Sequence, residues 1–479
     1  MRPVSRRAVL RTVGGAAVAG GVAGCGLGSG TGTGGVPAIP IEAATSSLDP
    51  YFPGHGAGGF LVNRYTLDLA YSQSIGRVAG TATIRVLPFT ALSALSLDLA
   101  AGMNVISVLV NGATARFSRQ ADKLHVQPSG ALASGRMAVL EIAYSGSPGP
   151  VSVPGAGPAG WQAVGTGVGV LSLPTGAPTW FPCADHPTLK SAYEISVTVP
   201  EGLSVLANGR LVSKSAQNFG TKWTYLHDGP MATYLATVQI GDFVVRESTG
   251  PAGVQIRNAF PAGVAAEAGI DLGRQSQMLT TFAGLFGPYP FDVYGTAVVN
   301  ASLVDGIYGA QTLGLLSASM VDGKRTNEGL VARGLAFQWF GGSVSLDAWR
   351  DIWLSTGFAL YAQWVWSEKS GGANADTHAR GAMTQLRAFG QDLILSDPGA
   401  DRILDPRVEL RGACFLHALR LSMGDQAFFQ LLRVWCNRNQ SGSAQTADFT
   451  ALVPEVFTGE DLTSLMGYWV DKAPLPELP

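Results

Sequence analysis

Residues 331–364 read VARGLAFQWFGGSVSLDAWRDIWLSTGFALYAQW. The aromatic residues of this stretch stand at helical spacing, so we expect Trp339, Phe340 and Trp353 to lie in a packed core. The stretch contains no histidine and only two acidic residues. It therefore predicts buried helical structure that is poor in the side chains that usually bind metal ions.

The sequence around this stretch changes from a β-rich to a helical texture. From about 60 to 245, short runs of β-forming residues such as MAVLEIAYSG and AYEISVTVP alternate with turn signals such as NG and SG. Short strands at this spacing predict an antiparallel sandwich or saddle. Helical spacing begins near 265, and the chain is predicted to be mainly helical from about 326 to 479. We therefore expect an α+β protein with more than one domain, as its 479 residues allow.

The segment at residues 1–25 has the pattern of an export signal. SRRAVLR (Ser5–Arg11) carries paired arginines ahead of an apolar run rich in Gly and Ala, as twin-arginine signals do. The run ends at VAGC (Val22–Cys25), which resembles a bacterial lipobox whose cysteine is lipidated after cleavage. Residues 26–48 follow as an expected flexible tether. We therefore expect an exported protein, lipid-anchored through Cys25 to the outer face of the cytoplasmic membrane.

The composition limits the classes of partner. The formal net charge of −2, with 14% charged residues, leaves no basic footprint for nucleic acid. The 46% hydrophobic content suits a folded chain rather than a disordered one. No later segment has eighteen consecutive apolar residues, so we expect membrane contact only through the lipid.

The cysteines and histidines show no pattern of a metal site. Cys183, Cys414 and Cys436 follow the leader without a CxxC motif. Cys414 and Cys436 lie on successive helical segments and could form a disulfide or remain free buried thiols. No two of the six histidines are three or four residues apart, so no helix presents a pair. We expect His186 to hydrogen-bond locally and His417 to be a satisfied core residue.

The segment TWFPCADHPTLKSAYEISVTVPEGLSVLANG (Thr179–Gly209) resembles the end of the N-terminal β domain in the aminopeptidase N family of zinc metallopeptidases. GPMATYLATVQIGDF, FGPYPFDVYG, FQWFGGSVSLDAWRDIWLSTGFALY and RGACFLHALRLSMGD resemble later blocks of the family, in the same order. The resemblance covers about 58–479. It implies an N-terminal antiparallel β-saddle domain at 49–245 and a mainly helical, thermolysin-like peptidase domain at 246–479.

The family binds zinc through two histidines one helical turn apart and a glutamate on the next helix. A glutamate after the first histidine is the general base that acts on the zinc-bound water. Alignment of H-E-x-x-H-x-W-F-G with RGLAFQWFG puts Arg333 and Phe337 at the histidine positions and Gly334 at the base. Alignment of W-L-N-E-G-F-A with WLSTGFA puts Thr356 at the third ligand, without a gap. The family would use zinc, but these residues predict no metal or other cofactor here.

Two more functional positions of the family can be carried over. The glutamate that binds the substrate α-amine aligns with Gly309 in IYGAQT, and the oxyanion tyrosine aligns with Glu409 in VELRGA. Opposite charges would then stand at two facing positions, where each alone would be costly to bury. We therefore predict that Arg333 and Glu409 form an ion pair where zinc would lie. The alternative is that each side chain faces solvent in an open cleft.

These losses predict a catalytically inactive homologue, or pseudoenzyme, of the family. Without zinc, base, oxyanion donor and amine anchor, no interaction remains that would lower the barrier to peptide hydrolysis. The remaining function would be the binding of a peptide or an envelope partner in the former active-site cleft. The alternative is an aminopeptidase that acts through a noncanonical site, although no G-x-S-x-G motif is present. A purely structural envelope protein is the third hypothesis.

Overall fold

The computed structural model describes residues 49–301, 303 and 306–479, which belong to one compact unit of the chain. The signal at 1–25, its lipidation site Cys25 and the tether at 26–48 lie outside the described residues and stay predictions. Within the described part, no helix is both long and apolar enough to cross a membrane.

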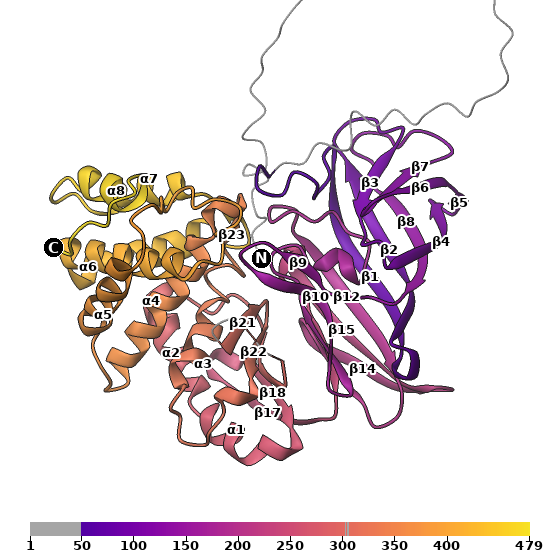
Figure 1. The fold of residues 1–479 in the computed structure, drawn as a ribbon. Coiled ribbons are helices and arrows are strands. Elements are labelled where there is room, and N and C mark those ends of the chain that lie inside the picture. Colours follow the sequence, from indigo (N-terminus) through magenta and orange to yellow (C-terminus); the bar gives the residue numbers. More distant parts are fainter. Residues whose placement is uncertain (1–48, 302, 304–305) are drawn as a thin grey trace, which may run out of the picture. The chain divides into compact units, whose positions relative to one another are not determined.

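Eight strands form the largest sheet, in the order β14-β15-β12-β1-β2-β8-β4-β5 (Figure 1). They are β1 (Phe60–Ser72), β2 (Arg77–Pro88), β4 (Met103–Val110), β5 (Ala113–Thr114), β8 (Ala138–Gly146), β12 (Ser191–Val199), β14 (Arg210–Gln217) and β15 (Gly220–Met231). Burial alternates along β8, as expected for a strand with one face on the core. Neighbours are antiparallel except β1 and β12, which run parallel and place Tyr65 beside Tyr193. The predicted antiparallel β domain is therefore present, with one parallel pair inside it.

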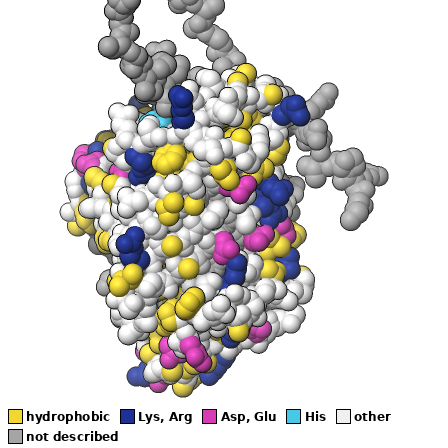
Figure 2. Space-filling view, turned by 90° about the vertical axis from the view of Figure 1, so that its right-hand side faces the viewer, with side chains coloured by type: hydrophobic (Ala, Val, Ile, Leu, Met, Phe, Trp, Pro, Cys, Tyr) yellow, Lys and Arg dark blue, Asp and Glu magenta, His cyan; other side chains and the backbone are white. Residues whose placement is uncertain are grey.

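Two smaller sheets complete the β-rich part. The five-stranded sheet has the order β13-β16-β11-β10-β9, and the three-stranded sheet has the order β3-β7-β6. Their strands are β3 (Leu95–Asp98), β6 (Arg116–Gln120), β7 (Lys123–Gln127), β9 (Val151–Val153), β10 (Gly157–Val164), β11 (Gly167–Leu171), β13 (Ser204–Ala207) and β16 (Val238–Gly241). Lys and Arg side chains are interspersed with Asp and Glu on the face seen in Figure 2.

A six-stranded sheet begins the second part of the chain, in the order β17-β18-β20-β22-β21, with β19 paired to β18. The strands are β17 (Phe243–Thr249), β18 (Gln255–Pro261), β19 (Val293–Tyr294), β20 (Thr296–Val299), β21 (Ile307–Ala310) and β22 (Leu313–Ser317). Strands β18, β20 and β22 are parallel, whereas β21 is antiparallel to β22 and forms an edge. This edge strand carries Gly309 toward the helices.

Helices dominate the rest of the chain, as the sequence predicted. They are α1 (Ala265–Asp271), α2 (Gln275–Phe286), α3 (Glu328–Ala336), α4 (Trp353–Lys369), α5 (Ala375–Ala388), α6 (Pro406–Arg438), α7 (Thr446–Val456) and α8 (Thr463–Val470). Two short strands, β23 (Ser345–Leu346) and β24 (Ser443–Ala444), pair between them. Helix α6 begins with Asp405 as its N-cap and bends at Gly424, whose φ of 77° lies outside the helical region.

Close packing of α4 against α6 places the ends of both helices beside α3. A Cβ added to Gly357 of α4 would lie only 3.0 Å from the Cα of Gly412 in α6. The predicted core aromatics Trp339, Phe340 and Trp353 are all buried in the structure, so that prediction is confirmed. Because the glycines allow this approach, the helices hold the pocket-lining residues on a rigid base.

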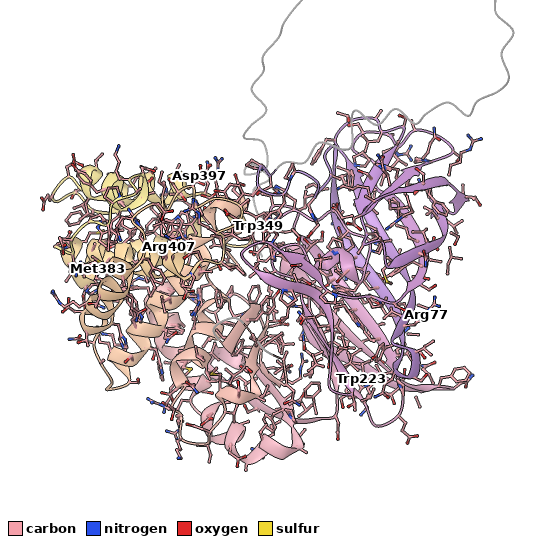
Figure 3. All side chains as sticks on the ribbon, in the orientation of Figure 1. Arg77, Trp223, Trp349, Met383, Asp397 and Arg407 are labelled. Atoms are coloured by element: carbon pink, nitrogen blue, oxygen red, sulfur yellow. The ribbon has the colours of Figure 1, made fainter. Side chains whose placement is uncertain are left out.

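Trp349, labelled in Figure 3, ties the β-rich and helical parts together. Its backbone N–H donates to the Asp49 carboxylate over 2.7 Å, and its ring lies 5.1 Å from that of Tyr234 and 5.9 Å from that of Phe52. The ammonium of Lys190 donates to three backbone carbonyls of the helical part, over 2.9 to 3.2 Å. The two parts therefore meet through buried polar contacts as well as through aromatic packing.

Candidate functional site

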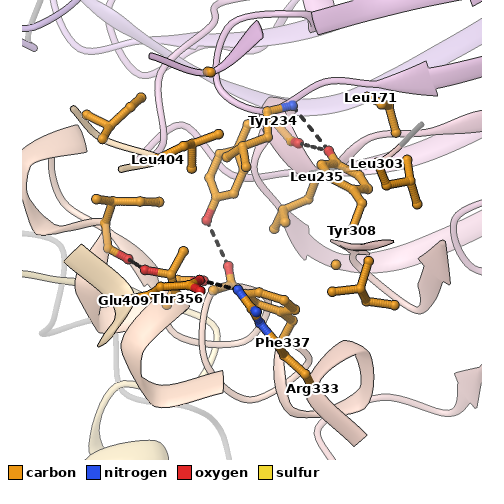
Figure 4. Close-up of a pocket in the computed structure, with 18 of the residues that line it drawn as sticks. Leu171, Tyr234, Leu235, Leu303, Tyr308, Arg333, Phe337, Thr356, Leu404 and Glu409 are labelled. Carbon is orange, nitrogen blue, oxygen red and sulfur yellow. Dashed lines mark hydrogen bonds and ion pairs between the residues drawn. The ribbon is translucent and has the colours of Figure 1, made fainter. Parts of the chain in front are cut away.

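A pocket with an empty volume of about 1050 Å³, open solvent at its mouth included, lies where the β-rich part meets the helices. Five of the six positions that the alignment singled out line this pocket: Gly309, Arg333, Phe337, Thr356 and Glu409 (Figure 4). They come from β21, α3, α4 and α6, which are far apart in the sequence. Their convergence supports the register of the alignment, since a shifted register would scatter them.

Arg333 and Phe337 share one face of α3 and its C-terminal end. The backbone N–H of Phe337 donates to the carbonyl oxygen of Arg333 over 3.2 Å, which places the two residues one helical turn apart. Gly334 does not line the pocket but faces β21, where an added Cβ would lie 2.9 Å from Cδ1 of Ile307. A side chain at Gly334 would therefore require Ile307 to move.

The guanidinium of Arg333 forms an ion pair with the carboxylate of Glu409, as predicted. The two side chains are 7% and 14% exposed, so the alternative of two solvent-facing charges is wrong. Glu409 lies in the first turn of α6, where the helix dipole favours a negative charge. The guanidinium carbon of Arg333 also lies 5.9 Å from the centre of the Phe337 ring. Burial of this pair is tolerated because each charge compensates the other.

Phe337 and Gly309 fit each other. A Cβ added to Gly309 would overlap the ring of Phe337, which packs directly against the edge strand β21. A larger residue at position 309 is therefore incompatible with the present position of the ring. The phenylalanine therefore fills the volume between α3 and β21.

Thr356 lies in the first turns of α4 and offers no carboxylate to the pocket. Its hydroxyl donates to the carbonyl oxygen of Ile352 over 3.3 Å. The hydroxyl of the neighbouring Ser355 donates to the carbonyl oxygen of Phe340 over 3.0 Å. Both hydroxyl protons are therefore used within the protein itself.

Two tyrosines of the pocket were missed in the sequence analysis. The hydroxyl of Tyr234 donates to the carbonyl oxygen of Gly341 over 2.9 Å, and that of Tyr308 donates to the carbonyl oxygen of Tyr234 over 2.7 Å (Figure 4). Burial raises the pKa of both tyrosines well above the ordinary value, so both are neutral near pH 7. Tyr234 belongs to the block GPMATYLATVQIGDF, and Tyr308 directly precedes Gly309, so proximity to those motifs was the available signal.

The pocket residues do not fit a zinc ion. Zinc in proteins binds histidine nitrogen, cysteine sulfur or carboxylate oxygen, whereas Arg333 carries a permanent positive charge and Phe337 has no donor atom. Among the described residues, no group of three or more His, Cys, Asp or Glu side chains is placed to hold a metal ion. Arg333 and Phe337 therefore offer no ligand that zinc prefers, and the loss of the family's metal site stays a prediction.

Two histidines and two cysteines outside the pocket lining are held in the interior of the protein. Nδ1 of His186 lies 2.8 Å from the hydroxyl of Thr188, and Nδ1 of His417 lies 3.2 Å from that of Tyr361, so both local predictions are confirmed. Cys414 and Cys436 are free and buried, which decides against the disulfide. Burial raises the pKa of the Cys414 thiol to about 12, so it is not a reactive nucleophile at neutral pH.

Two family models match the chain. The Peptidase M1 N-terminal domain matches residues 62–235, and the Peptidase family M1 domain matches residues 306–469. The leucyl aminopeptidase of Saccharolobus solfataricus is 25% identical over 441 residues, which cover 87% of this chain and 54% of that protein. Aminopeptidase N of Oryctolagus cuniculus is 32% identical over 199 residues, or 39% of this chain and 21% of that protein. The chain thus spans about half or less of the length of these curated relatives.

Solved structures match over nearly the whole described part. A mutant M1 zinc metallopeptidase of Deinococcus radiodurans, bound to a Tyr-Ser-Ala substrate, has a TM-score of 0.83 and 30% identity. The match covers 90% of this chain and 98% of that chain. Yeast LTA4 hydrolase has a TM-score of 0.75 at 19% identity, over 92% of this chain and 72% of that chain, which shows likeness of fold alone.

Proposed function

Because the chain belongs to peptidase family M1, the aminopeptidase N family, we propose that it is a member without peptidase activity. The ion pair between Arg333 and Glu409 is the observation that carries this proposal. It occupies the place where the alignment puts a zinc ligand and the oxyanion tyrosine. The fold of the family is kept, while the groups that perform its chemistry are replaced.

Electrostatics argue against a zinc ion at this place. Arginine carries a permanent positive charge in proteins, so the guanidinium of Arg333 would repel a dication. Phe337 contributes only a hydrocarbon ring, and the hydroxyl of Thr356 is neutral and bonded to its own helix. A zinc ion would therefore lose all three protein ligands and gain one unfavourable charge.

The groups that act on the peptide bond are absent as well. Gly334 provides no general base, and Gly309 provides no carboxylate for a substrate amine. The carboxylate of Glu409 has no proton to donate to an oxyanion while it is paired with Arg333. A negative group at that position would raise the energy of a developing oxyanion rather than lower it.

The test is a metal and activity measurement on the purified full-length protein. We expect no stoichiometric zinc by elemental mass spectrometry, and no hydrolysis of aminoacyl p-nitroanilides above the level of buffer. An active M1 aminopeptidase prepared in parallel is the positive control. One tightly held zinc ion per chain, whose removal abolishes hydrolysis, would contradict the proposal and favour a metallopeptidase with a noncanonical site.

We further propose that a lipid on Cys25 holds the protein at the outer face of the cytoplasmic membrane, where the former active-site pocket binds an envelope partner. The paired arginines, the apolar run and the lipobox-like VAGC support the anchor. Cell fractionation tests it: Cys25→Ser should move the protein from the membrane fraction to the soluble fraction, while Cys183→Ser should not. Retention of Cys25→Ser in the membrane fraction would contradict the lipid anchor.

A further inference from the structure

We infer that the pocket above the Arg333–Glu409 pair binds an uncharged acyl chain rather than a peptide terminus. The inference rests on the proposed function, since it takes the former active-site cleft to be a binding site without zinc. It goes further by naming the chemical class of the ligand. Two features of the pocket support it: its aliphatic walls, and the ion pairs and hydrogen bonds that already engage its polar groups.

The walls of the pocket are mostly aliphatic. Leucine and isoleucine side chains come from both parts of the molecule: Leu171, Leu173, Leu235, Ile307, Ile352 and Leu404. Figure 4 shows Leu171 and Leu235 on one side of the pocket and Leu404 on another. The space between these walls opens to solvent at its mouth. Burial of an aliphatic chain here would be favourable, because it removes apolar surface from water.

The carboxylates that line the pocket are already neutralised. Glu409 is paired with Arg333, and Asp405 accepts hydrogen bonds from the guanidinium of Arg407 over 2.7 to 3.1 Å. A peptide amino terminus carries a positive charge and would have to displace one of these guanidinium groups. The pocket therefore disfavours the charged end of a peptide.

The hydroxyl protons of the pocket are also used. Those of Tyr234, Tyr308, Ser355 and Thr356 are each donated to a backbone carbonyl of the protein. The carbonyl groups of an inserted peptide would therefore find none of these hydroxyl protons free, and a buried carbonyl left without a donor destabilises the complex. A hydrocarbon chain needs no such partners, so the lining favours it over a peptide.

A fluorescent fatty acid tests this inference. The full chain with Cys25→Ser lacks the predicted lipid, so its own anchor cannot fill the pocket during titration with cis-parinaric acid. We expect saturable binding of one probe per chain. We also expect Leu404→Asp and Leu171→Asp, on opposite walls, to weaken it at least tenfold, while Leu404→Met preserves it. Phe219→Ser, at an exposed hairpin tip far from the pocket lining, is the matched surface control. Thermal unfolding of each variant confirms that it is folded.

Competition separates the sources of the chain. Displacement by methyl dodecanoate or monododecanoylglycerol as well as by dodecanoic acid would show that any acyl chain suffices, as in a lipid. Displacement by dodecanoic acid alone would assign the site to free fatty acids, and both results support the inference. Absence of saturable binding, binding unchanged by the aspartate variants, or displacement only by a peptide such as Tyr-Ser-Ala would overturn it. These outcomes are independent of the zinc assay, so an empty pocket would leave the loss of peptidase activity standing.

Discussion

Two buried arginines at neighbouring places in the fold are held by different means. Arg333 in α3 is paired with the carboxylate of Glu409, whereas Arg411, two residues further along α6, is surrounded by backbone carbonyls. It donates to the oxygens of Leu393, Tyr468, Trp469, Lys472, Ala473 and Pro474. Burial lowers the pKa of Arg411 to about 10, which still leaves it charged at neutral pH.

The two arginines have different roles: Arg411 supports the fold, whereas Arg333 belongs to the pocket. Arg411 belongs to the same VELRGA segment as Glu409, and it links α6 to the end of α8 and to the residues that follow it. Glu409, in the same turn of the helix, stands at the position that the alignment gives to the oxyanion tyrosine. The fold therefore depends on Arg411, while the site at Glu409 could change as long as Arg333 changed with it.

The largest expected effect is at Arg411. Arg411→Met would leave several buried carbonyl groups without donors, and we expect it to lower the free energy of unfolding by about 4 kcal/mol. Arg411→Lys should recover only part of the loss, because an ammonium cannot span the same carbonyls. Urea denaturation measures both. A loss below about 1 kcal/mol for Arg411→Met would mean that water replaces the guanidinium and that the carbonyl cage is not structural.

The next expected effect concerns the backbone positions that the alignment gives to the three zinc ligands: we expect them to suit zinc once the ion pair is removed. The triple variant Arg333→His, Phe337→His, Thr356→Glu places three zinc-binding side chains on the backbone positions that converge in the pocket. We expect it to bind about one zinc ion per chain and to gain about 3 kcal/mol of stability at a zinc concentration 100-fold above the dissociation constant. Isothermal titration with zinc checks this.

The double variant Arg333→His, Phe337→His is the matched control for the triple variant, since it lacks the third ligand and should bind zinc much more weakly. Equal affinity in the two variants would show that Thr356 is misplaced for a ligand. Peptidase activity is not expected in either, because Gly334 and Gly309 remain.

The third prediction concerns the coupling within the pair. Glu409→Gln leaves the guanidinium of Arg333 without its carboxylate, and we expect a loss of about 2 kcal/mol, less than for a fully enclosed pair because the pocket admits solvent. Adding Arg333→Met should restore part of that loss, giving a coupling energy of about 1 kcal/mol. A double-mutant cycle by urea denaturation measures it. Strictly additive effects would show that the two charges do not stabilise each other.

Sequence patterns were sufficient for the frame of the site and for the ion pair. The anchors around Arg333 and Thr356 fixed the register, and opposite charges at facing positions suggested the contact with Glu409. The patterns did not reveal that Phe337 packs against Gly309, because the fit of a ring to a glycine depends on the distance between α3 and β21. They also missed Tyr234 and Tyr308, whose hydrogen bonds join segments far apart in the chain. The parallel pairing of β1 with β12 escaped prediction for the same reason, since register between distant strands leaves no local signal.

A third way to bury a nitrogen base is to leave it unprotonated, and His227 is the example. Its Nε2 lies 2.7 Å from the amide nitrogen of Gln311, which donates to it, and burial lowers the pKa of His227 to about 4. The unfolded chain binds a proton near pH 6.5 and the folded chain does not, so stability is lost as pH falls from about 6.5 toward 4. We expect about 2 kcal/mol to be lost at pH 5 through this residue. His227→Gln should flatten that part of the stability profile, whereas His378→Gln, at a partly exposed site, should change it less. An unchanged slope in His227→Gln would mean that other groups control the acid sensitivity. Burial of His227 in its neutral form would then not be a measurable source of the pH dependence, unlike the paired and hydrogen-bonded charges of Arg333 and Arg411.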